Sequence, residues 1–249
     1  IQKVKNMPDY NGLFEAAFEG KGADIVTMGK AIASYQRILV SGNSPFDRWF
    51  YGDEADAISV AAIRGFNIFK GKGQCITCHS IGEKSALFTD HMMHNTGLGF
   101  KRSMGKEPDK KRMLIAPGTY AYVLKSNRDL VGHPPLPDVG FYEVTQNPDD
   151  RWKYRTPSLR NIAITAPYMH DGSIINLSDV IDFYNQGGML KNESGFPNVT
   201  QSPLIRPLGL REDEINDLVI FLKTLTGDNI AEVISDAFAT PVGDTTNKH

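Results

Sequence analysis

Cys75-Ile76-Thr77-Cys78-His79 contains both cysteines of the chain, and a histidine directly follows the second one. This order and spacing is the attachment pattern of c-type haem. The two thiols must reach the two vinyl groups of one porphyrin, and the imidazole of the next residue then lies beneath the iron. The stretch therefore predicts one covalent haem c, held by Cys75 and Cys78, with His79 as an axial ligand of the iron.

Three other interpretations of the motif fit the surrounding sequence less well. A redox-active Cys-x-x-Cys pair is typical of a βαβ setting, and strand patterns are sparse nearby. A structural zinc site needs four ligands, and no second cysteine pair exists. A disulfide between Cys75 and Cys78 would leave His79 without a role. Because haem is attached covalently outside the cytoplasm, the motif also predicts a periplasmic or exported protein.

The composition is that of a globular chain. Of the 249 residues, 41% are hydrophobic and 22% charged, which argues against disorder. The net charge of −2 and the lack of a basic stripe argue against nucleic-acid binding. No apolar run approaches the length of a membrane span. The chain begins at Ile1 without a leader pattern, so we expect a removed signal peptide or a fragment.

Apolar periodicity predicts helices over residues 24–40, 54–69, 178–184 and 212–225. Gly71 and Gly73 end the second of them just before the haem motif. Residues 97–155 carry glycine, proline and charge without a clear period, which predicts irregular loops. We therefore expect an all-α fold, a cytochrome c-like haem domain with long irregular loops.

The residue opposite His79 decides the chemistry of the iron. A methionine or histidine there is typical of electron transfer, whereas an open or weak position permits peroxide chemistry. The residue types alone leave many candidates open: His91, Met92, Met93, His94, Met104, Met113, Met169, His170 and Met189.

Several blocks of the chain resemble one known family. They are Ala-Ile-Ala-Ser-Tyr-Gln-Arg at 31–37, Ser-Pro-Phe-Asp-Arg at 44–48, Thr-Pro-Ser-Leu-Arg-Asn at 156–161 and Thr-Ala-Pro-Tyr-Met-His-Asp-Gly at 165–172. Over residues 8–227 the chain resembles the C-terminal part of the bacterial di-haem cytochrome c peroxidase and MauG family. The resemblance divides it into an inter-domain helix and linker (1–50), a cytochrome c-like haem domain (51–228) and a polar C-terminal tail (229–249). It also implies that an N-terminal haem domain is missing here.

The resemblance implies a second ligand for the iron. The family's ligand lies 17 residues after the proline of the Thr-Ala-Pro block, and Tyr184 occupies that position. It is a methionine in the peroxidases and a tyrosine in MauG-like members. The resemblance thus assigns His79 and Tyr184 to the haem iron, with Met169 as the alternative. A phenolate ligand should lower the reduction potential of the iron.

Further site residues follow from the resemblance. The family holds calcium partly through backbone carbonyls, which here belong to Thr165 and Pro167, and calcium readily accepts carbonyl oxygens. His94 and Arg160 would either bind haem propionates or order the loops around the haem. Both roles stay open for these two side chains.

The family resemblance predicts a haem-dependent, peroxidase-type oxidoreductase. Hydrogen peroxide would react at the haem of the missing domain, so no catalytic residue is assigned in this chain. The haem at Cys75, Cys78 and His79 would store or relay an oxidising equivalent. A small cytochrome, a cupredoxin or a protein substrate would supply electrons.

Two alternatives remain, an ordinary cytochrome c peroxidase and a mono-haem electron-transfer cytochrome or haem subunit of a larger complex. The oligomeric state, homodimer or subunit of a complex, is also open.

Overall fold

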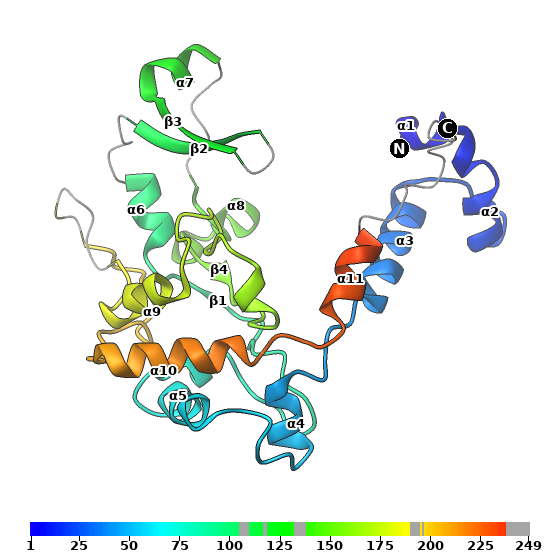
Figure 1. Cartoon of the computed structure of the whole chain (residues 1–249). Coiled ribbons are helices and arrows are strands. Elements are labelled where there is room, and N and C mark those ends of the chain that lie inside the picture. Colours follow the sequence, from blue (N-terminus) through cyan, green and yellow to red (C-terminus); the bar gives the residue numbers. More distant parts are fainter. Residues whose placement is uncertain (105–109, 117–118, 132–137, 190–194, 196, 238–249) are drawn as a thin grey trace.

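The structure is a computed structural model that describes residues 1–104, 110–116, 119–131, 138–189, 195 and 197–237. Most of its elements are helices, and Figure 1 shows their arrangement. In chain order the elements are α1 (Gln2–Lys5), η1 (Pro8–Tyr10), α2 (Leu13–Ala17), α3 (Ile25–Ile38), α4 (Pro45–Tyr51), α5 (Val60–Lys70), η2 (Cys75–Thr77), β1 (Met93–His94), α6 (Leu98–Met104), β2 (Lys110–Ala116), β3 (Thr119–Leu124), α7 (Lys125–Val131), α8 (Tyr142–Thr145), η3 (Pro148–Asp150), β4 (Tyr154–Arg155), η4 (Ile162–Ile164), α9 (Leu177–Asn185), α10 (Glu212–Lys223) and α11 (Ile230–Ala237).

Helices α5 and α10 pack against each other, and Figure 1 shows them in the lower part of the body. The hydroxyl of Ser59 caps α5 by accepting from the backbone N–H of Ala62, and three acidic residues open α10, where the helix dipole favours negative charge. The shared core is rich in aromatic side chains, among them Phe46, Phe66, Phe69, Phe88 and Phe221. Burial of these rings is the main force that holds the two helices together.

The two helices approach most closely at Gly65. A Cβ atom added there would lie 2.1 Å from the carbonyl oxygen of Asp217 and 2.8 Å from the Cβ of Phe221. Two ion pairs lie beside this crossing, Arg64 with Asp217 at 2.6 Å and Lys72 with Glu214 at 2.7 Å. The absence of a side chain at residue 65 is therefore what permits the observed helix spacing.

We expect Gly65→Ala to lower the free energy of unfolding by about 3 kcal/mol, because backbone of α10 blocks the new methyl group and the helices must separate. The matched control is Gly29→Ala in the interior of α3, where an added Cβ meets nothing within 4 Å. That change should raise stability by roughly 0.5–1 kcal/mol through helix propensity. Urea unfolding of the haem-loaded protein measures both values, and equal stability of the two variants would contradict the close crossing.

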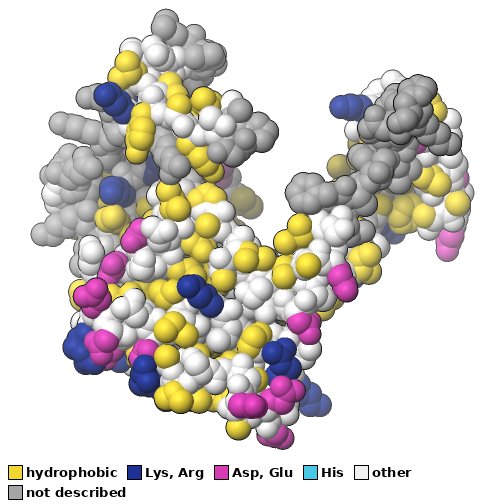
Figure 2. Space-filling model, viewed as in Figure 1, with side chains coloured by type: hydrophobic (Ala, Val, Ile, Leu, Met, Phe, Trp, Pro, Cys, Tyr) yellow, Lys and Arg dark blue, Asp and Glu magenta, His cyan; other side chains and the backbone are white. Residues whose placement is uncertain are grey.

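Helix α3 forms as predicted, but its apolar face is not buried. The side chain of Asp24 caps the helix by accepting from the N–H groups of Val26 and Thr27. Ile25 is 73% exposed and Ile32 56% exposed, and Figure 1 shows α3 extending away from the body beside α11. Figure 2 shows hydrophobic side chains along this arm. Periodicity identified the helix correctly, but it did not show whether anything covers its apolar face.

The expectation of an all-α fold is wrong. Two antiparallel strand pairs are present, β1 with β4 and β2 with β3. In β3 the side chains alternate between exposed and half-buried, which is the period of a strand. The pair β1–β4 joins segments about sixty residues apart in the chain, with His94 opposite Tyr154. Hydrogen bonds between distant segments create β1 and β4, so local helix periodicity could not predict this pair, whereas β2 and β3 are neighbours in the chain.

The predicted helix boundaries need smaller corrections. The second helix begins after Ser59 rather than near residue 54. Helix α9 begins after Asn176 rather than at Ser178. Residues 97–155, predicted to be irregular, contain helices α6, α7 and α8 as well as the strands β2, β3 and β4. The predicted tail contains α11, and residues 238–249 lie outside the described part of the chain.

Among the described residues no helix is both long and apolar enough to cross a lipid bilayer.

Candidate haem site

The Cys-x-x-Cys-His stretch follows directly on α5. Gln74 takes a left-handed conformation (φ 51°) and the chain then enters η2, where the N–H of His79 donates to the carbonyl of Cys75 at 2.9 Å. Gly73 permits this sharp turn, since an added Cβ would lie 2.9 Å from the carbonyl oxygen of Ile68. The short helical turn brings the two thiols and the imidazole to one side of the chain.

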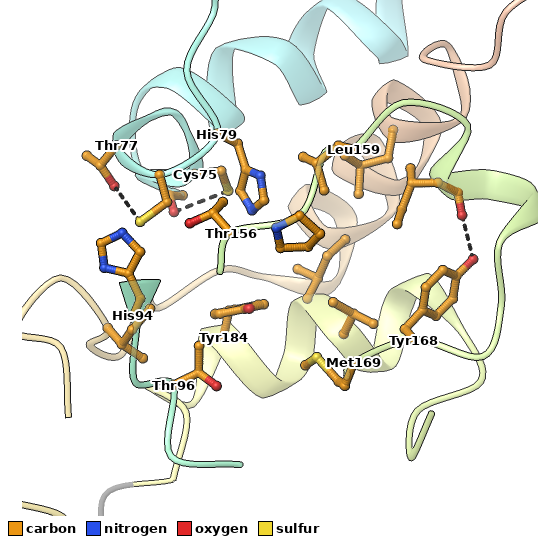
Figure 3. A pocket seen from close by; sticks show the side chains of 18 of the residues that line it. Cys75, Thr77, His79, His94, Thr96, Thr156, Leu159, Tyr168, Met169 and Tyr184 are labelled. Atoms are coloured by element: carbon orange, nitrogen blue, oxygen red, sulfur yellow. Dashed lines mark hydrogen bonds between the residues drawn. The ribbon is translucent and has the colours of Figure 1, made fainter. Parts of the chain in front are cut away.

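These side chains line a cavity of about 440 Å³, which falls in the usual range for ligand pockets. Figure 3 shows Cys75 and His79 on one side of it and Tyr184, from α9, facing them from the other. Much of the remaining wall is apolar, with Phe69, Leu98, Leu159, Ile181, Leu218 and Leu222. A cavity with two thiols, an imidazole and apolar walls suits a flat, largely apolar cofactor such as a porphyrin.

His79 is oriented to present one particular nitrogen to the cavity. Its Nδ1 lies 2.7 Å from the carbonyl oxygen of Phe88, so Nδ1 carries the proton and donates. Burial lowers the pKa of His79, which keeps the ring neutral. The lone pair of Nε2 is then free for a metal ion, the arrangement expected of an axial histidine.

Both cysteines are free thiols. Burial raises the pKa of Cys75 to about 12 and also raises that of Cys78. At neutral pH both sulfurs are therefore protonated and poor nucleophiles. These properties disfavour the redox interpretation of the motif and are compatible with thioether formation, which consumes neutral thiols.

Tyr184 is held in its neutral form by its surroundings. Burial, assisted by the neighbouring Cys78 and Cys75 sulfurs, raises the pKa of Tyr184 to about 12. A phenol in this position ionises near neutral pH only if a metal ion replaces its proton. Tyr184 therefore lies across the cavity from His79 as a neutral phenol, and it would need a metal ion to become an anionic ligand.

The cavity narrows the set of axial candidates. Of the nine methionines and histidines open from sequence, only His94, Met169 and His170 line it. Nε2 of His94 is bound to Asp90 at 2.8 Å, and Nε2 of His170 to Asp138 at 2.7 Å. This leaves Met169, which also lies in the cavity, as the competitor of Tyr184 (Figure 3).

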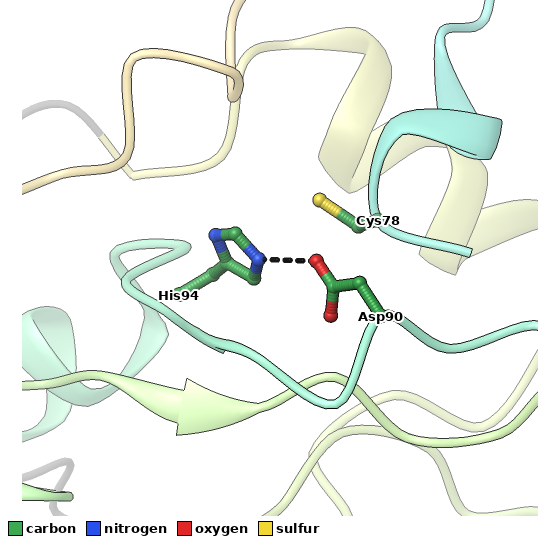
Figure 4. A group of neighbouring side chains, drawn as sticks. All are labelled: Cys78, Asp90 and His94. Carbon is green, nitrogen blue, oxygen red and sulfur yellow. Dashed lines mark hydrogen bonds and ion pairs between the residues drawn. The ribbon is translucent and has the colours of Figure 1, made fainter. Parts of the chain in front are cut away.

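Cys78, Asp90 and His94 form a compact group, with ligand atoms within 4.8 Å of one another (Figure 4). Burial tends to raise the pKa of Asp90, but hydrogen bonds from His94 and from the N–H of Met92 outweigh it and lower that pKa. As a group of three, these residues could bind a metal ion only through the sulfur that the predicted haem attachment would use. We therefore treat it as part of the haem site, in which Asp90 anchors the ring of His94 at the cavity wall.

Arg160 orders loops and does not line the cavity. Its guanidinium group makes two hydrogen bonds to Asp47, at 2.6 and 2.7 Å, and one to the carbonyl of Ala86 at 2.6 Å. The hydroxyl of Ser44 also accepts from it at 3.2 Å. Of the two roles left open by the sequence, the geometry supports the ordering role for Arg160. His94, in contrast, does line the cavity.

Comparison with known proteins identifies the family. The profile described as di-haem cytochrome c peroxidase matches residues 1–55. The chain is 36% identical to cytochrome-c peroxidase IdrP1 of Denitromonas iodatirespirans over 226 residues, which is 90% of this chain and 56% of the relative. It is also 36% identical to the methylamine utilization protein MauG of Methylorubrum extorquens, over 93% of this chain and 53% of the relative. The chain belongs to the di-haem cytochrome c peroxidase and MauG family.

A solved structure agrees with this family assignment. A MauG-like protein associated with microbial copper homeostasis superposes with a TM-score of 0.67 and 32% identity, over 96% of this chain and 64% of that one. Membership of the di-haem family implies haem c as the cofactor. The chain spans about half the length of the curated relatives it matches.

The calcium prediction concerns a segment on the edge of the same cavity. Thr165 and Pro167 both line it, and both residues are exposed. Nothing in the described residues tests whether their carbonyl oxygens bind an ion, so for this member of the family calcium stays a prediction.

One cluster at the cavity wall was not predicted from the sequence. Tyr154, from β4, lines the cavity, and its hydroxyl donates to Asp138. No local motif marks either residue, since Asp138 follows a proline-rich stretch and Tyr154 belongs to a strand that only long-range pairing defines. The alternation of apolar and polar residues around Tyr154 is too short to predict a strand.

Proposed function

We propose that this chain is the haem c-carrying segment of a peroxide-dependent oxidoreductase, with Cys75 and Cys78 as thioether residues. His79 and Tyr184 would be the axial ligands of its iron. The observation that carries the proposal is that these four side chains line the same cavity, although Tyr184 is over a hundred residues from the other three in the chain. Membership of the di-haem peroxidase and MauG family supports it.

Each of these residues contributes a property that a bound haem c would use. Phe88 holds the imidazole of His79 through Nδ1, so that Nε2 points to the metal position. Tyr184 would give up its proton on binding and remain as a phenolate, a hard anionic ligand. Apolar walls exclude water and so strengthen every charge interaction inside the cavity. The haem, when bound, supplies one-electron redox chemistry.

The role proposed for this segment is electron relay. Peroxide would react at a second haem elsewhere in the protein, with residues 1–50 as the link to that domain and residues 51–228 as the relay domain. A small cytochrome, a cupredoxin or a protein substrate would supply the electrons. Covalent haem attachment supports a periplasmic or exported location, and calcium at Thr165 and Pro167 would stabilise the junction.

An ordinary cytochrome c peroxidase, with Met169 on the iron, is the second candidate, supported by the presence of Met169 in the cavity.

The proposal is tested by the absorption spectrum of the purified ferric protein, with its complete chain, before and after one equivalent of hydrogen peroxide. We expect a spectral change that persists until a reductant is added. Peroxide pretreated with catalase is the control and should leave the spectrum unchanged. An unchanged spectrum with active peroxide would exclude the peroxide-dependent role and favour a simple electron-transfer cytochrome.

A further inference from the structure

A carboxylate with several polar partners lies at the cavity wall, outside the set of residues that would bind the haem. Asp138 accepts from the hydroxyl of Tyr154 and contacts Nε2 of His170 at 2.7 Å. Arg102 approaches it at 3.9 Å and also lies 3.8 Å from Asp171. Asp138 is 21% exposed, so its partners rather than water satisfy most of its oxygen lone pairs.

Tyr154 is held firmly between this carboxylate and the cavity. Its ring stacks on that of His170, with centroids 3.8 Å apart and planes 13° from parallel. The phenol also lies against backbone, since a Cβ added at Gly99 would be 2.5 Å from its oxygen. Stacking, the hydrogen bond and the glycine contact together fix the phenol in a single position beside the cavity.

Asp138 is suited to take a proton. Burial tends to raise the pKa of Asp138, but hydrogen bonds from Tyr154 and His170 outweigh burial and lower that pKa, so the group is ionised at neutral pH. Burial and the hydrogen bond to Asp138 raise the pKa of Tyr154 strongly, so its phenol keeps its proton at rest. The resting pair is therefore a neutral phenol with a carboxylate already bonded to its proton.

The other tyrosines in the cavity lack such a partner. Among the described residues that line it, the tyrosines are Tyr154, Tyr168 and Tyr184. The hydroxyl of Tyr168 donates to the backbone carbonyl of Ile162 at 2.9 Å, and an amide carbonyl is too weak a base to retain a proton. Tyr184 lies opposite His79 and is the proposed ligand of the haem iron. A phenol that loses an electron becomes a very strong acid, so only Tyr154 has a neighbour that can take the proton at once.

We propose that Tyr154 is a redox-active tyrosine that passes single electrons to the haem, with Asp138 as the acceptor of its phenolic proton. In this step Tyr154 loses one electron to the haem group after peroxide has oxidised that group. The O–H bond of the phenol breaks as an O–H bond forms on Oδ1 of Asp138, leaving a neutral tyrosyl radical. An external one-electron donor then reduces the radical, and the proton returns. The inference rests on the proposed function.

The test is electron paramagnetic resonance of the haem-loaded, full-length protein, frozen after oxidation. Two oxidants are used separately, hydrogen peroxide and a flash-generated ruthenium(III) polypyridyl complex, which needs no peroxide chemistry. We expect an organic radical whose line shape changes when the protein contains ring-deuterated tyrosine. It should be lost in Tyr154→Phe, which keeps the ring that stacks on His170, and retained in the matched control Tyr168→Phe.

Asp138→Asn provides a second, independent variant. The amide keeps an oxygen that accepts the phenolic hydrogen bond but cannot retain the proton, so the radical signal should fall sharply while the ferric haem spectrum stays unchanged. A full signal in Tyr154→Phe, a radical that responds only to deuterated tryptophan, or no radical with either oxidant would overturn the proposal. If the ruthenium complex produces the radical but hydrogen peroxide does not, the result contradicts the proposed peroxide function. If hydrogen peroxide changes the haem spectrum but neither oxidant produces a radical, the result contradicts only the role of Tyr154.

Discussion

Replacing Cys75 and Cys78 together with serine is expected to abolish covalent haem attachment. A serine hydroxyl does not form the thioether bond, whereas His79 and the apolar walls of the cavity remain. Any haem still bound should then be extracted by acidified acetone, and the intact mass of the denatured chain should lack the haem. Mass spectrometry and haem staining of a denaturing gel measure this directly.

Thr77→Ser is the matched control, because Thr77 lies between the two cysteines in the same η2 turn and its hydroxyl donates to the carbonyl of Gln74 at 2.6 Å. Serine keeps that hydroxyl, so covalent haem should be retained in full. Covalent haem on the double serine variant would show that the motif is not the attachment site.

Tyr184→Met is expected to raise the reduction potential of the haem by on the order of 0.1 V or more, within the range of about 0.8 V over which axial ligands shift it. A neutral thioether stabilises ferrous iron better than an anionic phenolate does. In the unaltered protein protons compete with iron for the Tyr184 oxygen, so phenolate ligation should fade as the pH falls. Potentiometric titration and the absorption spectrum against pH measure the two effects.

Tyr168→Phe is the control for this exchange, since Tyr168 lines the same cavity but donates its hydroxyl to Ile162. The reduction potential of the haem in this variant should equal that in the unaltered protein. If Tyr184→Met leaves the potential unchanged while Met169→Leu shifts it, Met169 is the ligand and the assignment of Tyr184 is wrong.

Much of the haem site could be predicted because its chemistry is local. The two thiols and the imidazole must be close in the chain to meet one porphyrin, so five consecutive residues carried the information. Helices α5 and α10 were also predictable, since their apolar faces repeat with the helical period and are buried against each other. The position of Tyr184 came from family resemblance and not from any local pattern.

Other features could not be predicted from local pattern. The strand pair β1–β4 exists because residues 93–94 meet residues 154–155, so the all-α expectation failed. The Tyr154–Asp138 contact joins residues sixteen apart that no local motif links. The apolar face of α3 shows the converse, because a correct helical period did not reveal that the face is exposed.

The sequence by itself determined the local features, which are the haem attachment motif and the periods of the helices. Covalent connectivity and backbone geometry within a short stretch of chain are enough to produce these features. Which groups share the cavity is a matter of packing. The close crossing at Gly65 and the placement of His79 and Tyr184 in one cavity both join segments more than a hundred residues apart in the chain. Such contacts form only when burial of the common core outweighs the entropy lost in closing long loops, so they are properties of the whole fold.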